Sequence, residues 1–335
     1  MNYLEEDLQK LSAYIKEKNF SGSTIMVTGA TGLIGSLCIK ALVNSGDIHV
    51  IGFARNPQKI ESIFGEMAEN VNFIYQDISE PLPDSIECDF IIHTANSTTS
   101  NFFITNPVEV IESIYEGTKR ILDYGVEHDV KGIVYLSSME VFGKVDSSQR
   151  IGEKELGYLD IQNVRSCYSE GKRLAELLCK SYAIEYDLPV KVARLAQTFG
   201  AGVPKTENRV FAQFARCAIK GEDIVLHTLG RSVGNYCYTV DVIRALLLLL
   251  KEGESGDVYT VVNEETTRTI VDMAQMVADE FSKGKSKIVF DIPEVNQYGY
   301  APDTKMRLSA EKLRSLGWKP EVSLTEMYRR MIPYL

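Results

Sequence analysis

A glycine-rich turn near the N-terminus constrains the fold of this chain more than any other feature. The apolar run at residues 25–27 leads directly into TGATGLIG, residues 28–35, and a helical pattern begins at once. Gly29 permits a tight turn, Gly32 lets the backbone approach a pyrophosphate, and Gly35 lets the helix pack on its strand. The N-terminus of that helix would face the phosphates. A strand, a glycine-rich turn and a helix in this order predict a dinucleotide-binding unit. The expected cofactor contacts are Gly29, Thr31, Gly32, Leu33, Ile34 and Gly35.

Short β-branched runs alternate with amphipathic stretches over the first two thirds of the chain. Six runs are apolar on both faces, as buried parallel strands are. They cover residues 24–27, 49–53, 71–75, 90–94, 132–136 and 190–195. Strand and helix in alternation predict right-handed βαβ units, and therefore an α/β fold with a Rossmann-type, doubly wound parallel sheet.

The strand and helix periodicity weakens after Phe199, which indicates a smaller C-terminal, substrate-binding lobe. We expect an N-terminal helical extension at residues 1–22 and a dinucleotide-binding Rossmann domain at 23–195, with a later contribution from about 235–262. Residues 196–335 then form mainly the substrate-binding lobe.

Composition excludes several classes of partner. Lys and Arg total 36 against 46 Asp and Glu, so a net charge of -10 argues against nucleic acid or an acidic membrane surface. The six cysteines are scattered, without a CxxC pair or a metal-ligand spacing, so we expect no metal. No apolar core of a signal peptide is present, and the longest aliphatic run, residues 245–250, is too short to span a bilayer. We therefore expect a cytoplasmic protein.

The ends of the second and third strands bear on the choice of cofactor. An acidic residue at the end of the second strand would hold a free ribose 2′-hydroxyl, but this chain has Arg55 there. Arg55 could instead cover a 2′-phosphate, stack on adenine or lie in solvent, so the choice between NAD and NADP stays open. Asp77, followed by Ile78, could accept a hydrogen bond from the adenine amine or cap a helix.

A tyrosine and a lysine four residues apart form the candidate catalytic pair. Tyr168 and Lys172 open a helix and share one of its faces. Because tyrosine has an ordinary pKa of about 10, an adjacent ammonium group is needed for it to act as a base near neutral pH. A strand that ends in Ser137 and Ser138 lies about thirty residues earlier in the chain.

Four segments together make the sequence similar to a known family. TGATGLIG, SSMEVFG, YSEGK and LGWKP resemble the extended short-chain dehydrogenases of the NAD-dependent epimerase/dehydratase family, over almost the whole chain after residue 22. Residues 165–173 and 194–200 are most similar to the UDP-glucuronate decarboxylase branch. The resemblance implies that Tyr168 is the base, that Lys172 orients the nicotinamide ribose, and that Ser138 shares the hydrogen bond to the reacting sugar oxygen.

The resemblance also supplies further site residues and a partner. Glu140 falls where dehydratases and decarboxylases carry a glutamate, and Thr94 and Ala95 fall in the cofactor-binding segment. The substrate contacts it implies are Ser138, Arg165, Gln197, Thr198, Arg209, Arg231 and Tyr236. Similar helices in the family, at residues 107–126 and 170–186 here, pair across a homodimer; packing on the sheet is the alternative explanation of their apolar stripes.

Two departures separate this chain from individual branches. Met139 stands where 4,6-dehydratases have an aspartate, and Gly234 stands where decarboxylases carry an arginine. We therefore expect an NAD(P)-dependent nucleotide-sugar epimerase or related lyase that works through a 4-keto sugar. The alternatives are a UDP-glucuronate decarboxylase-like lyase, an NADPH-dependent keto-sugar reductase and, from another class, a non-catalytic dinucleotide sensor. The complete set of Ser138, Tyr168 and Lys172 favours an enzyme over a sensor.

Overall fold

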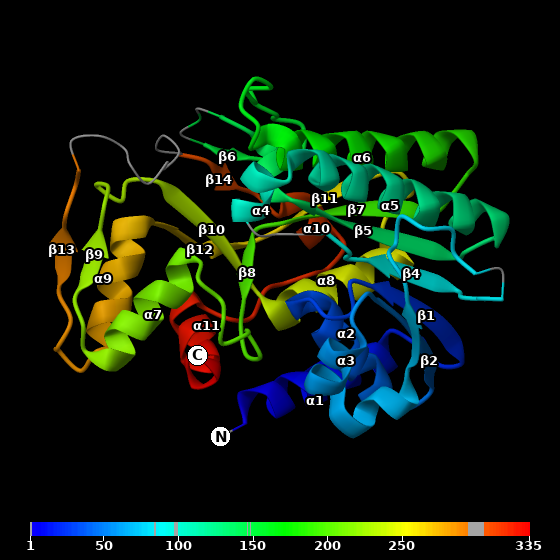
Figure 1. The fold of residues 1–335 in the computed structure, drawn as a ribbon, viewed down its shortest axis with the longest axis horizontal. Helices are drawn as coiled ribbons and strands as arrows, with labels where there is room; N and C mark the ends of the chain where they lie inside the picture. The colour runs from blue at the N-terminus through cyan, green and yellow to red at the C-terminus, as the bar shows by residue number, and fades with distance from the viewer. Residues whose placement is uncertain (1, 84, 97–99, 146, 148, 294–304) are drawn as a thin grey trace.

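A seven-stranded sheet forms the centre of the larger part of the molecule (Figure 1). The computed structural model describes residues 2–83, 85–96, 100–145, 147, 149–293 and 305–335. All neighbouring strands of the sheet run parallel. In order across the sheet they are β11 (Val258–Val261), β7 (Val190–Leu195), β5 (Gly132–Ser138), β4 (Phe90–His93), β1 (Ser23–Thr28), β2 (Ile48–Ala54) and β3 (Asn72–Tyr75). The α/β class and the doubly wound parallel sheet that the sequence predicts are confirmed.

Helices cover both faces of this sheet, because its central strands are apolar on both sides. One face carries α1 (Tyr3–Glu17), α2 (Leu33–Ser45) and α8 (Thr239–Glu252), with α3 (Pro57–Phe64) and the 3₁₀ helix η1 (Gly65–Asn70) at the edge. The other face carries α5 (Pro107–Glu127) and α6 (Ser166–Glu185), which pack side by side, with the short α4 (Ser100–Thr105) at their end.

A smaller lobe is built on short strands. One sheet has the order β12 (Asn263–Thr269), β10 (Val233–Tyr238) and β8 (Gln197–Phe199), and a second pairs β13 (Ile288–Phe290) with β9 (Ile224–Leu226). The helices α7 (Val210–Lys220), α9 (Ile270–Phe281) and α11 (Leu324–Met331) lie beside them (Figure 1). The remaining elements are η2 (Met139–Phe142), β6 (Arg150–Ile151), β14 (Arg307–Leu308), α10 (Glu311–Ser315) and η3 (Ile332–Tyr334).

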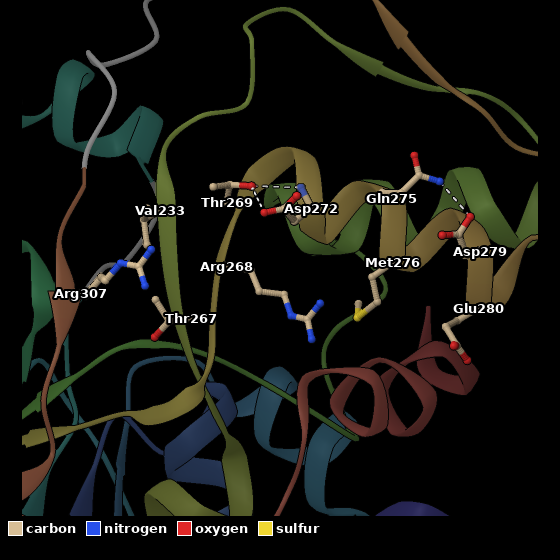
Figure 2. Close-up of a pocket in the computed structure, with 10 residues that line it drawn as sticks. All are labelled: Val233, Thr267, Arg268, Thr269, Asp272, Gln275, Met276, Asp279, Glu280 and Arg307. Carbon is tan, nitrogen blue, oxygen red and sulfur yellow. Dashed lines mark hydrogen bonds between the residues drawn. The ribbon is translucent and has the colours of Figure 1, made fainter. Parts of the chain in front are cut away.

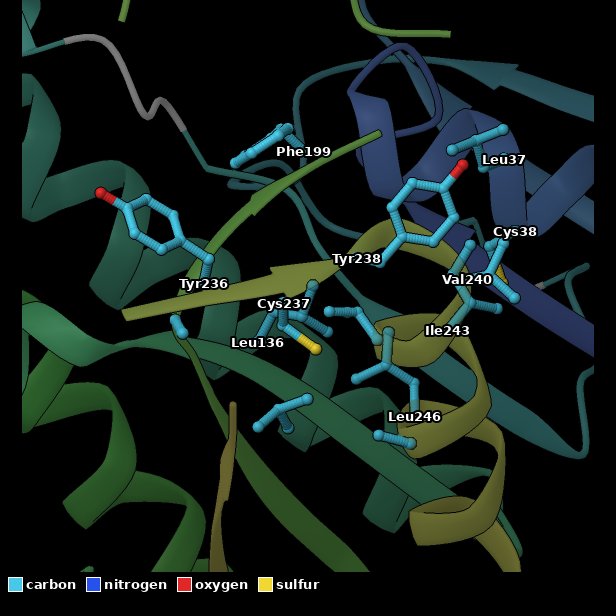
Figure 3. Close-up of a cluster of buried hydrophobic side chains, with 14 of the residues drawn as sticks. Leu37, Cys38, Leu136, Phe199, Tyr236, Cys237, Tyr238, Val240, Ile243 and Leu246 are labelled. Atoms are coloured by element: carbon cyan, nitrogen blue, oxygen red, sulfur yellow. The ribbon is translucent and has the colours of Figure 1, made fainter. Parts of the chain in front are cut away.

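The two parts share one hydrophobic core where β10 and α8 meet α2 and β5 (Figure 3). Tyr238 at the end of β10 is fully buried, and its hydroxyl donates a hydrogen bond to Asp7 of α1. Arg330 of α11 forms an ion pair with the same carboxylate at 3.0 Å. The N-terminal helix is therefore held by contacts from the C-terminal half of the chain.

Two searches of the described residues gave negative results. Within them, none of the helices combines the length and the hydropathy that crossing a bilayer requires. In the same part of the chain, no three His, Cys, Asp or Glu side chains come together as metal ligands would.

Candidate active site

The turn between β1 and α2 has the close approaches that its glycines allow. Gly29 has a φ of 69°, and a Cβ atom there would lie 2.5 Å from the Thr94 hydroxyl oxygen. A Cβ atom on Gly35 would lie 2.4 Å from the carbonyl oxygen of Gly29. Gly32 is the N-cap of α2 and provides no side chain to cap the first turn. The N–H groups at the start of α2 therefore lack a side-chain partner and suit the phosphates of a dinucleotide.

The end of β4 lies beside this turn and forms the second wall of the candidate cofactor site. The Thr28 hydroxyl accepts hydrogen bonds from the backbone N–H groups of Thr94 and Ala95, both at 3.1 Å. The Thr94 hydroxyl donates to the Thr28 carbonyl at 2.6 Å. The buried amide group of Asn96 has no hydrogen-bond partner among the described residues, so it is available to a polar ligand. These features fit a bound dinucleotide.

A cavity of about 850 Å³ lies at the position expected for the adenosine end. Arg55 and Asp77 line it and form an ion pair at 3.3 Å. Burial acts to raise the pKa of Asp77, but hydrogen bonds from Ser79 and the charge of Arg55 together hold it below its ordinary value. Glu109, Glu112 and Glu116 of α5 also line the cavity, which makes its wall acidic. Ile78, in contrast, is buried in the hydrophobic core.

Tyr168 lies at the start of α6 and is almost completely buried. Its ring stacks on Phe103 of α4, with centroids 4.4 Å apart and planes within 10°. Burial raises the pKa of Tyr168 to about 12, and the Glu140 carboxylate acts in the same direction, while a hydrogen bond with Ser138 acts to lower it. Ser138 ends β5, so the strand and the helix together place the two hydroxyl groups.

Lys172 is also buried, one turn further along α6. Its ammonium nitrogen donates to the Leu136 carbonyl at 2.6 Å and lies 5.9 Å from the Tyr168 ring centroid. Burial lowers the pKa of Lys172 to about 7. The sequence led us to expect a fully charged ammonium that lowers the pKa of Tyr168. Burial opposes this expectation, because a charged form of either group is poorly solvated there.

Glu140 and Arg165 form a two-pronged ion pair, with distances of 2.7 and 3.1 Å. The Ser169 hydroxyl donates to the same carboxylate at 3.3 Å, and the Arg165 guanidinium lies 5.6 Å from the Phe103 ring centroid. Arg165 therefore neutralises Glu140 and holds it in place, and its expected contact with substrate stays a prediction.

The substrate residues expected in the small lobe lie on several of its elements. Arg209 is the N-cap of α7 and pairs with Glu207 at 2.6 Å, yet its charge acts to lower the pKa of Tyr168. Gln197 is partly exposed on β8, and the Thr198 hydroxyl donates to the Ala196 carbonyl at 2.9 Å.

Arg231 and Tyr236 come from β10 and the loop before it. Arg231 is exposed in the loop before β10. Tyr236 is fully buried and packs edge-on to Phe199, with ring centroids 6.0 Å apart, and its expected contact with substrate stays a prediction. Alternation along the strand could not reveal this, because both faces of β10 are covered.

Phe103 and Ser169 were missed at the sequence level. Phe103 sets the plane of the Tyr168 ring, and Ser169 contributes to the position of Glu140. Phe103 comes from a segment more than sixty residues earlier, and no spacing rule relates the two. Ser169 lies beside Tyr168, but a serine in the first turn of a helix has no signal that separates it from a capping residue.

The fold and the glycine turn define a dinucleotide-binding enzyme of the doubly wound class. The model of the NAD dependent epimerase/dehydratase family matches residues 25–263, and the chain belongs to that family. Members of the family depend on NAD, which is therefore the cofactor of this chain.

Relatives and solved structures agree with this assignment. The chain is 28% identical over 316 residues to UDP-glucuronic acid decarboxylase 1 of Danio rerio, an alignment that covers 92% of this chain and 72% of the relative. It is also 28% identical to UDP-glucuronic acid decarboxylase 6 of Arabidopsis thaliana, with coverage of 91% and 87%. The fold is similar to that of UDP-glucose 4-epimerase from Thermotoga maritima, with a TM-score of 0.78, 23% identity and coverage of 93% and 98%.

The ion pair between Arg55 and Asp77 generates a prediction about cofactor choice. In Asp77→Asn, Arg55 loses its partner and becomes available to a 2′-phosphate, so the ratio of NADP affinity to NAD affinity should rise about two- to tenfold, as expected for an exposed pair. Calorimetry with both cofactors measures this ratio. Arg55→Ala is the matched variant: it should lower the ratio and leave NAD affinity almost unchanged. An unchanged ratio in both variants would show that Arg55 does not select the cofactor.

Proposed function

We propose that this chain converts a nucleotide-activated sugar in a redox-neutral reaction through a 4-keto intermediate, with Tyr168 as the base. The observation that carries the proposal is the buried Tyr168 hydroxyl, whose pKa the Ser138 side chain acts to lower and which has Lys172 one helical turn away. In this role Tyr168 removes the proton of the sugar C4 hydroxyl, while Ser138 holds the same oxygen by a hydrogen bond.

NAD supplies a hydride acceptor whose oxidised nicotinamide ring carries a positive charge. That charge is of the sign that stabilises a phenolate in a buried site, where Lys172 alone is only partly charged near neutral pH. When Lys172 is protonated, its ammonium group adds further positive charge beside the phenolate. Glu140, held by Arg165 and Ser169, is placed to move a proton on the keto intermediate.

Substitution of the base tests the proposal. Tyr168→Phe should fold and bind NAD as the wild type does, but lose turnover of its sugar nucleotide by about 10²- to 10⁴-fold, because it lacks the proton-transfer group. Tyr186→Phe, at the C-terminal end of the same helix, is the matched control and should retain full activity. Activity of Tyr168→Phe within tenfold of the wild type would remove Tyr168 from this role and would favour a sensor or another base.

The charges around Tyr168 favour a neutral sugar over a uronic acid. The two arginines whose charges reach Tyr168 are Arg165 and Arg209, and each is paired with a carboxylate, Glu140 or Glu207. A sugar carboxylate brought into this buried site would find those cations already neutralised, and an unpaired buried carboxylate costs several kcal/mol. We therefore propose epimerisation of a neutral nucleotide hexose as the net reaction.

Position 234 adds to the same argument. A Cβ atom on Gly234 would lie 2.1 Å from the Tyr236 hydroxyl oxygen, so the arginine that decarboxylases carry there would require the buried Tyr236 side chain to move. Arg231 is the nearest arginine in the sequence, in the exposed loop before β10. The similarity to UDP-glucuronic acid decarboxylases keeps decarboxylation as the second candidate function.

Two substrates decide between the candidates. We expect the enzyme to interconvert UDP-glucose and UDP-galactose, and to release carbon dioxide from UDP-glucuronate at least about 100-fold more slowly, as a missing charge partner worth about 3 kcal/mol implies. The measurements are chromatography of the sugar nucleotides and trapping of labelled carbon dioxide. Efficient decarboxylation would overturn the epimerase proposal, and its loss in Arg231→Ala would identify Arg231 as the cation that binds the carboxylate.

We further propose that the enzyme is a homodimer formed through α5 and α6. Leu174, Leu177 and Ile184 are exposed and recur at helical spacing on α6, and Val108 and Ile111 are exposed on α5. The two helices lie side by side on one face of the sheet (Figure 1). Pairing with the same helices of a second copy would remove this apolar surface from water.

Charge placed on this surface tests the dimer. The wild type should sediment at twice the chain mass, and the double variant Leu177→Arg/Ile184→Arg at the chain mass, because charges in an apolar interface lose their hydration. Ile219→Arg, at an exposed apolar residue of α7, is the matched control and should leave the mass unchanged. A wild-type monomer at micromolar concentration would contradict the proposal.

A further inference from the structure

Polar side chains also gather outside the residues that surround Tyr168. A pocket of about 470 Å³ in the small lobe is lined by Arg268, Arg307 and residues of α9 (Figure 2). A second group lies inside the main sheet, where the imidazole of His93, at the end of β4, is only 1% exposed. A buried imidazole has to satisfy its ring nitrogens within the protein, so its hydrogen-bond partners fix its protonation state.

The hydroxyl group of Thr28 determines the state of the nearer ring nitrogen of His93. The Thr28 hydroxyl oxygen accepts hydrogen bonds from the backbone N–H groups of Thr94 and Ala95, both at 3.1 Å, and these use both of its lone pairs. The same oxygen lies 2.7 Å from Nδ1 of His93. Because no lone pair is left, the hydroxyl group is the donor in this contact and Nδ1 is the acceptor. His93 is therefore neutral and carries its single ring proton on Nε2.

The second ring nitrogen of His93 contacts the helix that borders the adenosine cavity. Nε2 lies 3.5 Å from the hydroxyl oxygen of Thr118, a buried residue of α5. With the proton on Nε2, His93 donates to this hydroxyl in a weak hydrogen bond. The same helix provides Glu109, Glu112 and Glu116 to the wall of the cavity. One imidazole thus links β1, which leads into the glycine turn, to the helix beside the cofactor.

The surroundings of His93 favour the same neutral state. Burial lowers the pKa of His93 to about 3, and the charge of Lys172 acts in the same direction. The Lys172 ammonium nitrogen lies 4.5 Å from the ring centroid of Tyr135, and the same ring lies 5.5 Å from the His93 ring, centroid to centroid. A charged imidazole would be a second buried cation close to Lys172, without a carboxylate to offset it in these contacts.

The contact that His93 supports holds the two walls of the cofactor site together. A Cβ atom on Gly29 would lie 2.5 Å from the Thr94 hydroxyl oxygen and 2.9 Å from Cα of Ala95, so the glycine turn and the end of β4 touch. The Thr28 hydroxyl binds the backbone of β4 at this place. Without an acceptor at Nδ1, its proton would be buried and unpaired, and the hydroxyl could satisfy it only by turning away from the two N–H groups.

We propose that His93 is a positioning residue of the cofactor site: as a neutral imidazole with its proton on Nε2, it aligns the Thr28 hydroxyl and thereby fixes the end of β4 against the glycine turn. The role concerns the binding of NAD and is independent of the reaction that the sugar undergoes. It requires no proton transfer by His93.

Nitrogen NMR of the NAD-free wild-type protein, labelled with nitrogen-15 histidine, tests the protonation state. The couplings of the ring protons of His93 should show a neutral imidazole with a proton on Nε2 and none on Nδ1 at neutral pH. The chain has four histidines, and His93→Asn identifies the signals of His93 by their loss. A proton on Nδ1, or on both nitrogens, would overturn the proposal.

Calorimetry with NAD tests the positioning role. His93→Leu should weaken NAD binding about tenfold, as the loss of a buried hydrogen bond implies. His93→Asn should recover most of the affinity, because the side-chain oxygen of asparagine can take the place of Nδ1 and accept from Thr28. His49→Leu, at an exposed histidine of β2, is the matched control and should bind NAD as the wild type does. Unchanged affinity in His93→Leu, or an equal loss in His93→Leu and His93→Asn, would contradict the proposal.

A double-mutant cycle shows whether His93 acts through Thr28. Thr28→Val keeps the shape of the side chain but lacks the hydroxyl group, so it should weaken NAD binding by itself. If the effect of His93 passes through that hydroxyl, adding His93→Leu to Thr28→Val should change the NAD affinity by less than about twofold. Full, independent effects of the two substitutions, multiplied together in the double variant, would overturn the proposal.

Discussion

A buried ion pair between Arg194 and Glu176 fixes the helix that carries the reactive groups. Arg194 near the end of β7 donates to the Glu176 carboxylate of α6 at 2.7 and 3.0 Å, and the Ser137 hydroxyl of β5 donates to it at 2.5 Å. Two strands thus hold one helix at a single point. Removing either charge would leave the other buried without a partner, so this contact tolerates little movement. The positions of Tyr168 and Lys172 on the same helix depend on it.

Around that helix, carboxylates neutralise the two arginines whose charges act on Tyr168. Glu140 pairs with Arg165 and Glu207 with Arg209, so these two guanidinium groups offer little net charge to a ligand. Burial also moves the pKa values of both Tyr168 and Lys172 toward their neutral forms. Burial therefore opposes ionisation of either group, and in the proposed reaction the charge of bound NAD would offset this effect.

The small lobe is tied to the sheet rather than attached by a flexible linker. β10 passes from the lobe into the shared core, where Tyr238 meets Asp7, and β11 returns the chain to the edge of the main sheet beside β7. The substrate-binding residues proposed for the lobe are for this reason held in fixed register with Ser138 and Tyr168.

The sequence by itself determined the α/β class, the parallel sheet and the family. The turn at residues 28–35 and the four-residue spacing of Tyr168 and Lys172 are local patterns that can be recognised along the chain. Tertiary structure alone decided which charges are free and which side chains are accessible. Phe103 stacks on Tyr168, Arg165 is paired with Glu140, and Tyr236 is buried. Each of these outcomes depends on a partner from a distant segment of the chain. Burial and ion pairing are properties of packed neighbours, which no spacing along the chain specifies.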